Sequence, residues 1–342
     1  MLEGFHHEER KNERHIEVPD ENIERIEERS YRLESGITVD LIAKEFPYHG
    51  EEADHSKAII FLPGWSIKAT DSSIEEICRA YAERGKERTI AISASSPDEG
   101  AATLPKSTDF LNEEARAVAR YIEGSGIENV KLIGHSKGGD EAIDVAAILE
   151  EESTISVEGL GLIDSSGLYE QEEGAMSALR EHVMRGIPNE DEETRQRREK
   201  VLSEIRGNMF SEMIHYPWTF FSRLGSQVEG VSGLNPRAKK VKAPVVIITA
   251  TDDPVADPER IVPKRAEKRL RTSLGEEAGK SNKTMAAREQ FLQKHIFKSS
   301  PYVRMRVSEK MPHHMLPLLR PEQVVDVSLY EFERAHRKPT LQ

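Results

Sequence analysis

From about residue 30, the chain alternates short apolar runs with longer amphipathic segments. Strands are predicted at "SYRLES" and "TVDLIAKEF", as a pair, and then at "KAIIFLPG", "RTIAISAS", "NVKLIGHS" and "VEGLGLIDSS". Helices are predicted between the later runs, at "SSIEEICRAYAERG", which begins at serine and ends at glycine, at "DFLNEEARAVARYIEGSG" and at "GGDEAIDVAAILEEE". Strands that alternate with helices of this length predict an α/β fold with a mostly parallel central sheet flanked by helices.

The alternation stops between residues 170 and 235. This stretch contains no good strand, only helical segments such as "EGAMSALREHVMRG" and "ETRQRREKVLSEIRGNMFSEMIHYPWTFFSRLG". The sheet pattern resumes with "APVVIITATDD" and, after a polar helical stretch, with "YVRMRVSEKM". An all-helical insert between two strands of one sheet predicts a cap over the edge where ligands bind. We therefore expect a core at residues 29–169 and 236–342 and a helical cap at residues 170–235.

The first 28 residues are dense in charge and poor in apolar periodicity. This pattern predicts a loosely attached or partly helical arm that precedes the fold. The remaining length fits a single large α/β domain with an insertion.

Composition narrows the class of partner. The formal net charge of -13 disfavours nucleic acid, because its phosphates need a basic footprint. Cys78, the single cysteine, cannot form an internal disulfide, and the sequence shows neither a signal-peptide pattern nor an apolar run of about 18 residues. We expect a cytoplasmic protein without stable membrane insertion.

The stretch "VKLIGHSKGGDEAI" carries the first candidate for chemistry. Gly134, Ser136 and Gly138 satisfy G-x-S-x-G between a predicted strand and a predicted helix. A sharp turn there would strain the serine, expose its hydroxyl and crowd out side chains two residues away on either side. The amide of Lys137 and the helix N-terminus would then point toward an oxyanion, whereas the Lys137 side chain would point to solvent or along the helix. The alternative is a small residue in a tight turn without chemistry.

A serine nucleophile needs a base and a group that orients the base. With its strand, turn and helix, "LIGHSKGG" resembles the nucleophile turn of the α/β-hydrolase family. The resemblance implies an acid after a late strand, in a pattern similar to G-x-x-D-P-[VL]-V-P. The segment "ATDDPVAD" matches the D-P-V core, with alanine for the first glycine, and this match implies Asp253. Asp252 is the near alternative, and an Asp-Pro turn without a catalytic role is another.

The same resemblance implies a histidine in the loop after the last strand, seven residues before a proline that opens the final helix. In "HHMLPLLRPEQV" this histidine is His314, seven residues before Pro321, rather than the adjacent His313. The alternatives are a surface histidine pair and a two-histidine metal site, which the absence of a carboxylate at ligand spacing disfavours. We expect neither a metal ion nor a cofactor. The order Ser136, Asp253, His314 is that of the family.

The second oxyanion donor implied by the resemblance is the amide of Trp65, in the loop "FLPGWSIK". Gly64 would allow the close backbone approach, and Pro63 stands where the family often has histidine. Trp65 is also a candidate wall of the substrate pocket, with an ordinary, partly buried aromatic residue as the alternative.

The resemblance covers residues 30 to 169 and 236 to 335, with two departures. The loop "SSPDEGAA" replaces an arginine-glycine loop that is frequent after the fourth strand, and a polar helical insertion occupies about residues 263 to 298.

The resemblance implies a serine hydrolase that cleaves an ester or related acyl bond of a small, partly apolar molecule through an acyl-enzyme. Candidate substrate contacts in the predicted cap are Met209, Met213 and Trp218, although such an apolar stripe more often packs a cap on its core. The alternatives are an acyltransferase or a carbon-carbon bond hydrolase with the same triad, and a binding protein without catalysis.

Overall fold

The computed structural model describes residues 25–50, 53–95, 110–165, 168, 191–215, 235–250, 281–308 and 320–337. They form an eight-stranded sheet with the order β1-β2-β4-β3-β5-β6-β7-β8. The strands are β1 (Arg25–Arg32), β2 (Thr38–Phe46), β3 (Lys57–Leu62), β4 (Arg88–Ser95), β5 (Asn129–His135), β6 (Ser156–Ile163), β7 (Val245–Ala250) and β8 (Val303–Ser308). The antiparallel pairs are β1 with β2 and β2 with β4, and every later pair is parallel. The predicted mostly parallel sheet is confirmed.

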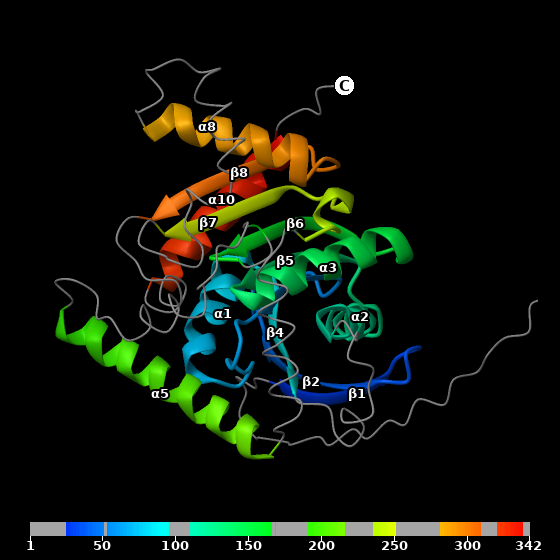
Figure 1. The fold of residues 1–342 in the computed structure, drawn as a ribbon, viewed down its shortest axis with the longest axis vertical. Coiled ribbons are helices and arrows are strands. Elements are labelled where there is room, and N and C mark those ends of the chain that lie inside the picture. Colours follow the sequence, from blue (N-terminus) through cyan, green and yellow to red (C-terminus); the bar gives the residue numbers. More distant parts are fainter. Residues whose placement is uncertain are drawn as a thin grey trace, which may run out of the picture.

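Helices cover both faces of this sheet (Figure 1). One face carries α1 (Ser72–Gly85) and α10 (Pro321–Arg337), and the other carries α2 (Phe110–Glu123) and α3 (Lys137–Glu152). Successive side chains of β3 divide between the two cores: Ile59 and Phe61 pack with the first pair of helices, Ile60 and Leu62 with the second. A strand covered on both sides needs apolar residues at every position, which explains the unbroken run "AIIFL".

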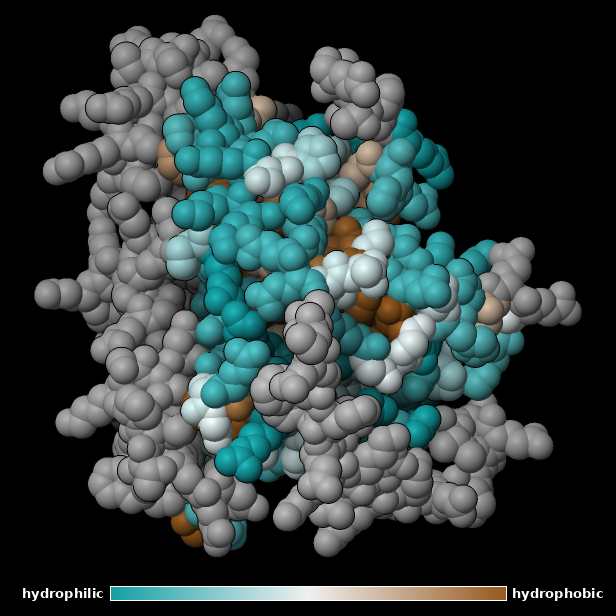
Figure 2. Space-filling view, turned by 90° about the vertical axis from the view of Figure 1, so that its right-hand side faces the viewer, coloured by the Kyte–Doolittle hydropathy of each residue, from teal (hydrophilic) through white to brown (hydrophobic). Residues whose placement is uncertain are grey.

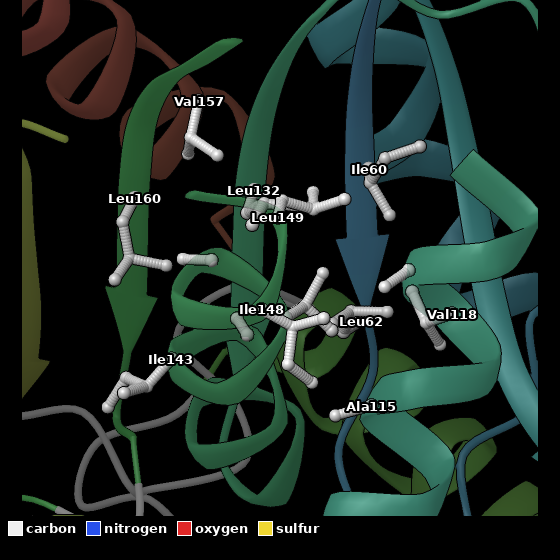
Figure 3. Packing of buried hydrophobic residues seen from close by; sticks show 14 of the residues in the cluster. Ile60, Leu62, Ala115, Val118, Leu132, Ile143, Ile148, Leu149, Val157 and Leu160 are labelled. Carbon is white, nitrogen blue, oxygen red and sulfur yellow. The ribbon is translucent and has the colours of Figure 1, made fainter. Parts of the chain in front are cut away.

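In the core between the sheet and helices α2 and α3, side chains of the helices pack against side chains of the strands. Figure 3 shows Ile143 and Leu149 of α3 among side chains from β3, β5 and β6, with Val118 of α2 beside Ile60 and Leu62. Close packing of this kind fixes where the strands end. The loops that leave β3 and β5 therefore start from rigid positions.

Near β8 lies α8 (Ser281–Phe291), which is followed by the π-helical turn η4 (Leu292–Ile296). The 3₁₀ turn η2 (Ala238–Lys240) contacts α3 and η4. Figure 1 shows α8 outside β8, at the opposite end of the sheet from β1. This helix lies within the polar insertion that the sequence predicts.

Helix α5 (Glu192–His215) lies outside α1, away from the sheet (Figure 1). Val201 and Leu202 are its buried residues, and they join the core formed with α1 and α10. The helix agrees with the helical pattern of the predicted cap, most of which falls outside the described residues.

The predicted arm at residues 1–28 is wrong at its end, because β1 begins at Arg25. This strand is an edge strand that pairs with β2 through its backbone, for example Arg29 opposite Leu41. Its partly buried side chains are Glu27, Arg29 and Tyr31. Partly buried and exposed positions therefore alternate along the strand, but most of the partly buried residues are charged. A search for apolar alternation misses such a strand.

The described surface is mostly hydrophilic on the face in Figure 2, with small apolar patches between hydrophilic residues. Among the described helices, none is both long and apolar enough to cross a membrane.

Candidate active site

Three loops leave neighbouring parallel strands at the same edge of the sheet. They follow β3, β5 and β6, and the sheet order places β5 between the other two strands. The carboxyl ends of parallel strands are where α/β proteins bind ligands. The candidate site is therefore centred on the end of β5, where Ser136 lies.

Ser136 occupies the turn between β5 and α3 with φ 53° and ψ -120°. Its N–H donates to the carbonyl oxygen of Ile163 at the end of β6 (3.0 Å), and its carbonyl accepts from Gly139 N–H (3.0 Å). A serine with positive φ is strained, and such strain persists only where the surrounding structure imposes it. The side chain is partly exposed, although His135 and Gly138 are buried. The sharp strand-to-helix turn that the sequence predicts is confirmed.

The two glycines of the motif are required by backbone packing. A Cβ on Gly134 would lie 2.5 Å from Gly139 Cα, and one on Gly138 would lie 2.6 Å from the carbonyl carbon of Leu62. Both neighbours are main-chain atoms and cannot rotate away. The turn is thus packed against itself and against the end of β3.

The loop after β3, residues 63–71, lies directly against the serine. An added Cβ at Gly64 would be 3.2 Å from Ser136 Cβ and 3.3 Å from His135 Nδ1. The loop closes on itself, because Ile67 N–H donates to Gly64 O (3.2 Å). Trp65 is partly buried, and Ser66 is buried with φ 58°. We call residues 63–71 the β3 loop. It is the loop in which the sequence predicts the second oxyanion donor.

Lys137 is the first residue of α3, so its N–H belongs to the N-terminal turn, whose amides have no partner within the helix. The Lys137 side chain runs along α3 toward Glu141 (Nζ to Oε2, 3.9 Å). Its nearer partner is Glu114 of α2, a carboxylate that is almost completely buried. The predicted direction along the helix is confirmed, and the ion pair with α2 is an addition that the sequence did not reveal.

Asp164 is a site-edge residue that the sequence analysis missed. It follows β6, is 0% exposed and has φ 43°. Its N–H donates to Ile248 O (2.8 Å), and its Oδ1 accepts from Ala250 N–H (3.1 Å). These bonds tie the end of β6 to the end of β7, three residues before the predicted acid. The available signal was an aspartate directly after the apolar run "GLGLI".

Helix α5 also reaches the β3 loop, which the sequence did not predict. Asn208 Nδ2 donates to Ser66 O (3.0 Å) and to Asp71 Oδ2 (2.7 Å). The same carboxylate accepts from Lys68 N–H (2.8 Å). Burial raises the pKa of Asp71, and the negative charge of Glu204 raises it further, while the hydrogen bonds act in the opposite direction.

Of the other predicted residues, the structure describes the two methionines of α5 and none of the rest. Met209 is partly buried on α5, and Met213, on the same helix, is 40% exposed. Outside the described residues lie Trp218, both candidate acids (Asp252, Asp253) and both candidate bases (His313, His314). Within the described segments, no group of three or more His, Cys, Asp or Glu side chains is arranged to hold a metal ion.

The chain matches no protein-family model, and no curated protein matches it. Solved structures do match. A thermophilic esterase from Thermogutta terrifontis is 14% identical with a TM-score of 0.53, over 90% of this chain and 99% of that one. Est816, described as an N-acyl homoserine lactone degrading enzyme, is 16% identical with a TM-score of 0.54, over 84% and 95%.

A third solved structure is an alpha/beta hydrolase enzyme from the metagenome of sediments of the Mar Chica lagoon, Morocco. It is 16% identical with a TM-score of 0.50, over 86% of this chain and 96% of that one. At identities this low, the structural matches establish a shared fold only, and the activity has to be argued from the site.

Proposed function

This chain has the α/β-hydrolase fold, and on that premise we propose that it is a serine hydrolase that cleaves an ester bond. One observation carries the proposal. Ser136 is held at positive φ at the end of β5, and the Gly64 backbone packs so closely that an added Cβ at Gly64 would lie 3.2 Å from the Ser136 Cβ. A strained serine beside a glycine loop and a helix N-terminus suits attack on a carbonyl carbon.

In the proposed reaction, His314 removes the Ser136 hydroxyl proton as the oxygen attacks the substrate carbonyl. The carbonyl π electrons move to oxygen, and that oxyanion accepts hydrogen bonds from the N–H groups of Trp65 and Lys137. Asp253 orients the imidazole and stabilises its protonated form. The histidine then protonates the leaving alcohol, the acyl-enzyme forms, and water releases the acid by the same steps in reverse order.

The α3 N-terminus supports the role of the Lys137 amide. Lys137 is the first helical residue, and the helix dipole favours negative charge at this end. The Lys137 side chain is engaged by Glu114, so it stands apart from the acid-base step.

The proposed substrate is a small, partly apolar ester or related acyl compound. Esterases among the structural neighbours agree with this class, and Est816 acts on a lactone, which is a cyclic ester. Met209, Met213 and Trp218 are the proposed cap contacts, and residues 170–235 are the proposed cap. We propose that no cofactor takes part.

Labelling with a fluorophosphonate probe tests the nucleophile. The wild type should be labelled, and Ser136→Ala should lose both labelling and at least about 10³-fold of its activity on nitrophenyl esters of graded acyl length. Ser203→Ala is the matched control, because Ser203 is exposed on α5. A folded but unlabelled wild type would favour a binding protein.

Product analysis with added alcohols would reveal an acyltransferase, and activity on carbon-carbon bonds alone would replace the ester assignment.

Paired variants test the remaining triad. His314→Ala and Asp253→Asn should each lower kcat by more than about 10²-fold, whereas His313→Ala and Asp252→Asn should not. Activity should rise with pH, because the proposed base must be neutral to remove the serine proton. An equal loss in Asp252→Asn and Asp253→Asn would leave the acid unassigned.

A further inference from the structure

One face of helix α5 binds the start of α1 and the β3 loop through residues at helical spacing. Arg197, Val201, Glu204 and Asn208 are separated by four, three and four positions, so they share a face. Arg197 pairs with Glu76 of α1 (3.2 Å), and Val201 is buried against the α1 side of the core. Glu204 accepts hydrogen bonds from the Ser72 hydroxyl and from Ser73 N–H (3.3 Å). Asn208 is the last of the series and contacts the β3 loop itself.

The amide of Asn208 links two points of this loop. One Nδ2 donor group serves Ser66 O at 3.0 Å and Asp71 Oδ2 at 2.7 Å. Asp71 is fixed in turn, because its carboxylate accepts from Lys68 N–H and its own N–H donates to Lys68 O (3.0 Å). Asn208 thereby connects the residue after the predicted oxyanion donor to the rigid start of α1.

Ser66 is the part of the loop that most needs such a restraint. It is a non-glycine residue at φ 58°, in the left-handed region, which costs about 1 kcal/mol or more. No described residue hydrogen-bonds to its buried hydroxyl. The far end of the loop has its own bond, from Ala69 N–H to Ser93 Oγ (3.0 Å). The bond from Asn208 thus acts on the middle of the loop, beside Trp65.

We infer that Asn208 is a positioning residue that holds the β3 loop in the conformation needed for oxyanion binding, so that docking of α5 controls catalysis. The inference rests on the proposed function. The Trp65 N–H belongs to the Gly64–Trp65 peptide group, which follows directly on Gly64, where the loop faces Ser136, and lies two peptide groups before the Ser66 carbonyl that Asn208 holds. Oxyanion donors act only within about 2.7–3.1 Å of the developing charge. A small relaxation of Ser66 would therefore move the Trp65 amide out of range.

This arrangement makes the helix a regulator of the same site. A substrate or ligand that changes how α5 lies on α1 would move Asn208 and, with it, the loop. Asn208 itself is not among the proposed substrate contacts, so substrate binding should depend little on this bond, whereas stabilisation of the transition state should depend on it strongly.

Steady-state kinetics on nitrophenyl esters test the inference with three variants and the full-length protein. Asn208→Ala should lower kcat by about 10-fold or more and change KM by less than about 2-fold, because one misplaced oxyanion donor costs up to about 10²–10³-fold. Gly207→Ala and Arg197→Met are the controls. An added Cβ at Gly207 meets no atom within 4 Å, and Arg197 forms an exposed ion pair with α1 that contributes little to the docking of α5, so both variants should keep the wild-type kcat.

Asn208→Asp supplies a pH readout that a purely structural role would not move. An ionised carboxylate has no proton to donate to Ser66 O, and it would face Asp71 and Glu204, with Lys68 as the nearby cation. Protonation restores an O–H donor. The ratio of the variant kcat to the wild-type kcat should therefore rise several-fold, about 3-fold or more, between pH 8 and pH 5.5. This comparison within one folded variant holds even where Asn208→Ala folds poorly.

The two proposals fail in different ways. Full activity of Ser136→Ala would overturn the serine mechanism, whatever Asn208 does. If Ser136→Ala is inactive but Asn208→Ala matches Arg197→Met in kcat, the positioning role is overturned and the hydrolase stands. A pH-independent kcat ratio for Asn208→Asp, or a loss in Asn208→Ala confined to KM, would also overturn it.

Discussion

Helices α3 and α5 both reach the candidate site, but they are held in different ways. Every residue of α3 from Gly138 to Leu149 is buried, between the sheet and α2. The buried residues of α5 are Val201 and Leu202, whereas Phe210 and Ile214, near its C-terminus, are more than half exposed. Burial holds the first helix, and a few polar contacts on one face hold the second.

The difference separates what is rigid in the site from what is adjustable. The turn at Ser136 is closed by main-chain atoms that touch main-chain atoms, with no side chain able to yield. The middle of the β3 loop, by contrast, is held to the rest of the molecule by a side-chain amide from a lightly buried helix. We therefore expect substitutions in α3 to affect stability and activity together, and substitution of Asn208 in α5 to affect activity through the loop.

The largest effect is expected from Gly138→Ala compared with Gly207→Ala. A Cβ at Gly138 would lie 2.5 Å from Pro63 O and 2.6 Å from the Leu62 carbonyl carbon, so the turn and the β3 loop must move apart. We predict a loss of at least about 100-fold in kcat/KM and about 1–3 kcal/mol of stability. The same change at Gly207, in open space, should stabilise the protein by up to about 1 kcal/mol. Kinetics and thermal unfolding measure both. Wild-type activity in Gly138→Ala would refute the rigid description of the turn.

The next effect concerns one ion pair of each helix. Lys137→Met leaves the buried Glu114 carboxylate without the charge that faces it on α3, and should cost about 3 kcal/mol in urea unfolding. Arg197→Met removes the exposed pair with Glu76 on α5 and should cost less than about 1 kcal/mol. Equal costs for the two variants would contradict the contrast between the helices.

The smallest effect is a pH dependence at the α5 contact. Burial, with the charge of Glu204, raises the pKa of Asp71 above its unfolded value, so the folded state retains this proton to higher pH. Its contribution to stability is fully present below about pH 4 and is lost as pH rises through the raised pKa. Relative to wild type, Asp71→Asn should therefore gain stability between pH 4 and pH 7, as urea unfolding would show. Parallel pH profiles for the two proteins would exclude this linkage.

The fold was predictable wherever pattern and burial coincide. The runs "TVDLIAKEF" and "RTIAISAS" match β2 and β4 residue for residue, because both are paired on two sides. The sequence did not reveal where β1 begins, since an edge strand is stabilised by backbone pairing and tolerates charged residues on both faces. At the end of α1, the left-handed residue is Lys86, and Gly85 instead makes room for Ile59.

The residues of the candidate site likewise fall into those that the sequence predicted and those that it did not. The serine turn was predictable because the requirement for Gly134 and Gly138 is local and steric. Asp164 and Asn208 were not, because their partners lie 86 and 142 positions away in the chain. Asp253, His314 and Trp218 stay predictions that the experiments above test.

By itself, the sequence determined the alternation of strands and helices, the strained turn at Ser136 and the two glycines of its motif, because these depend on neighbours within a few residues. Only the tertiary structure decided that Glu114 pairs with Lys137 and that Asn208 holds the β3 loop. Such contacts join segments whose approach is set by packing of the whole sheet, and no local pattern records which distant side chain will meet them.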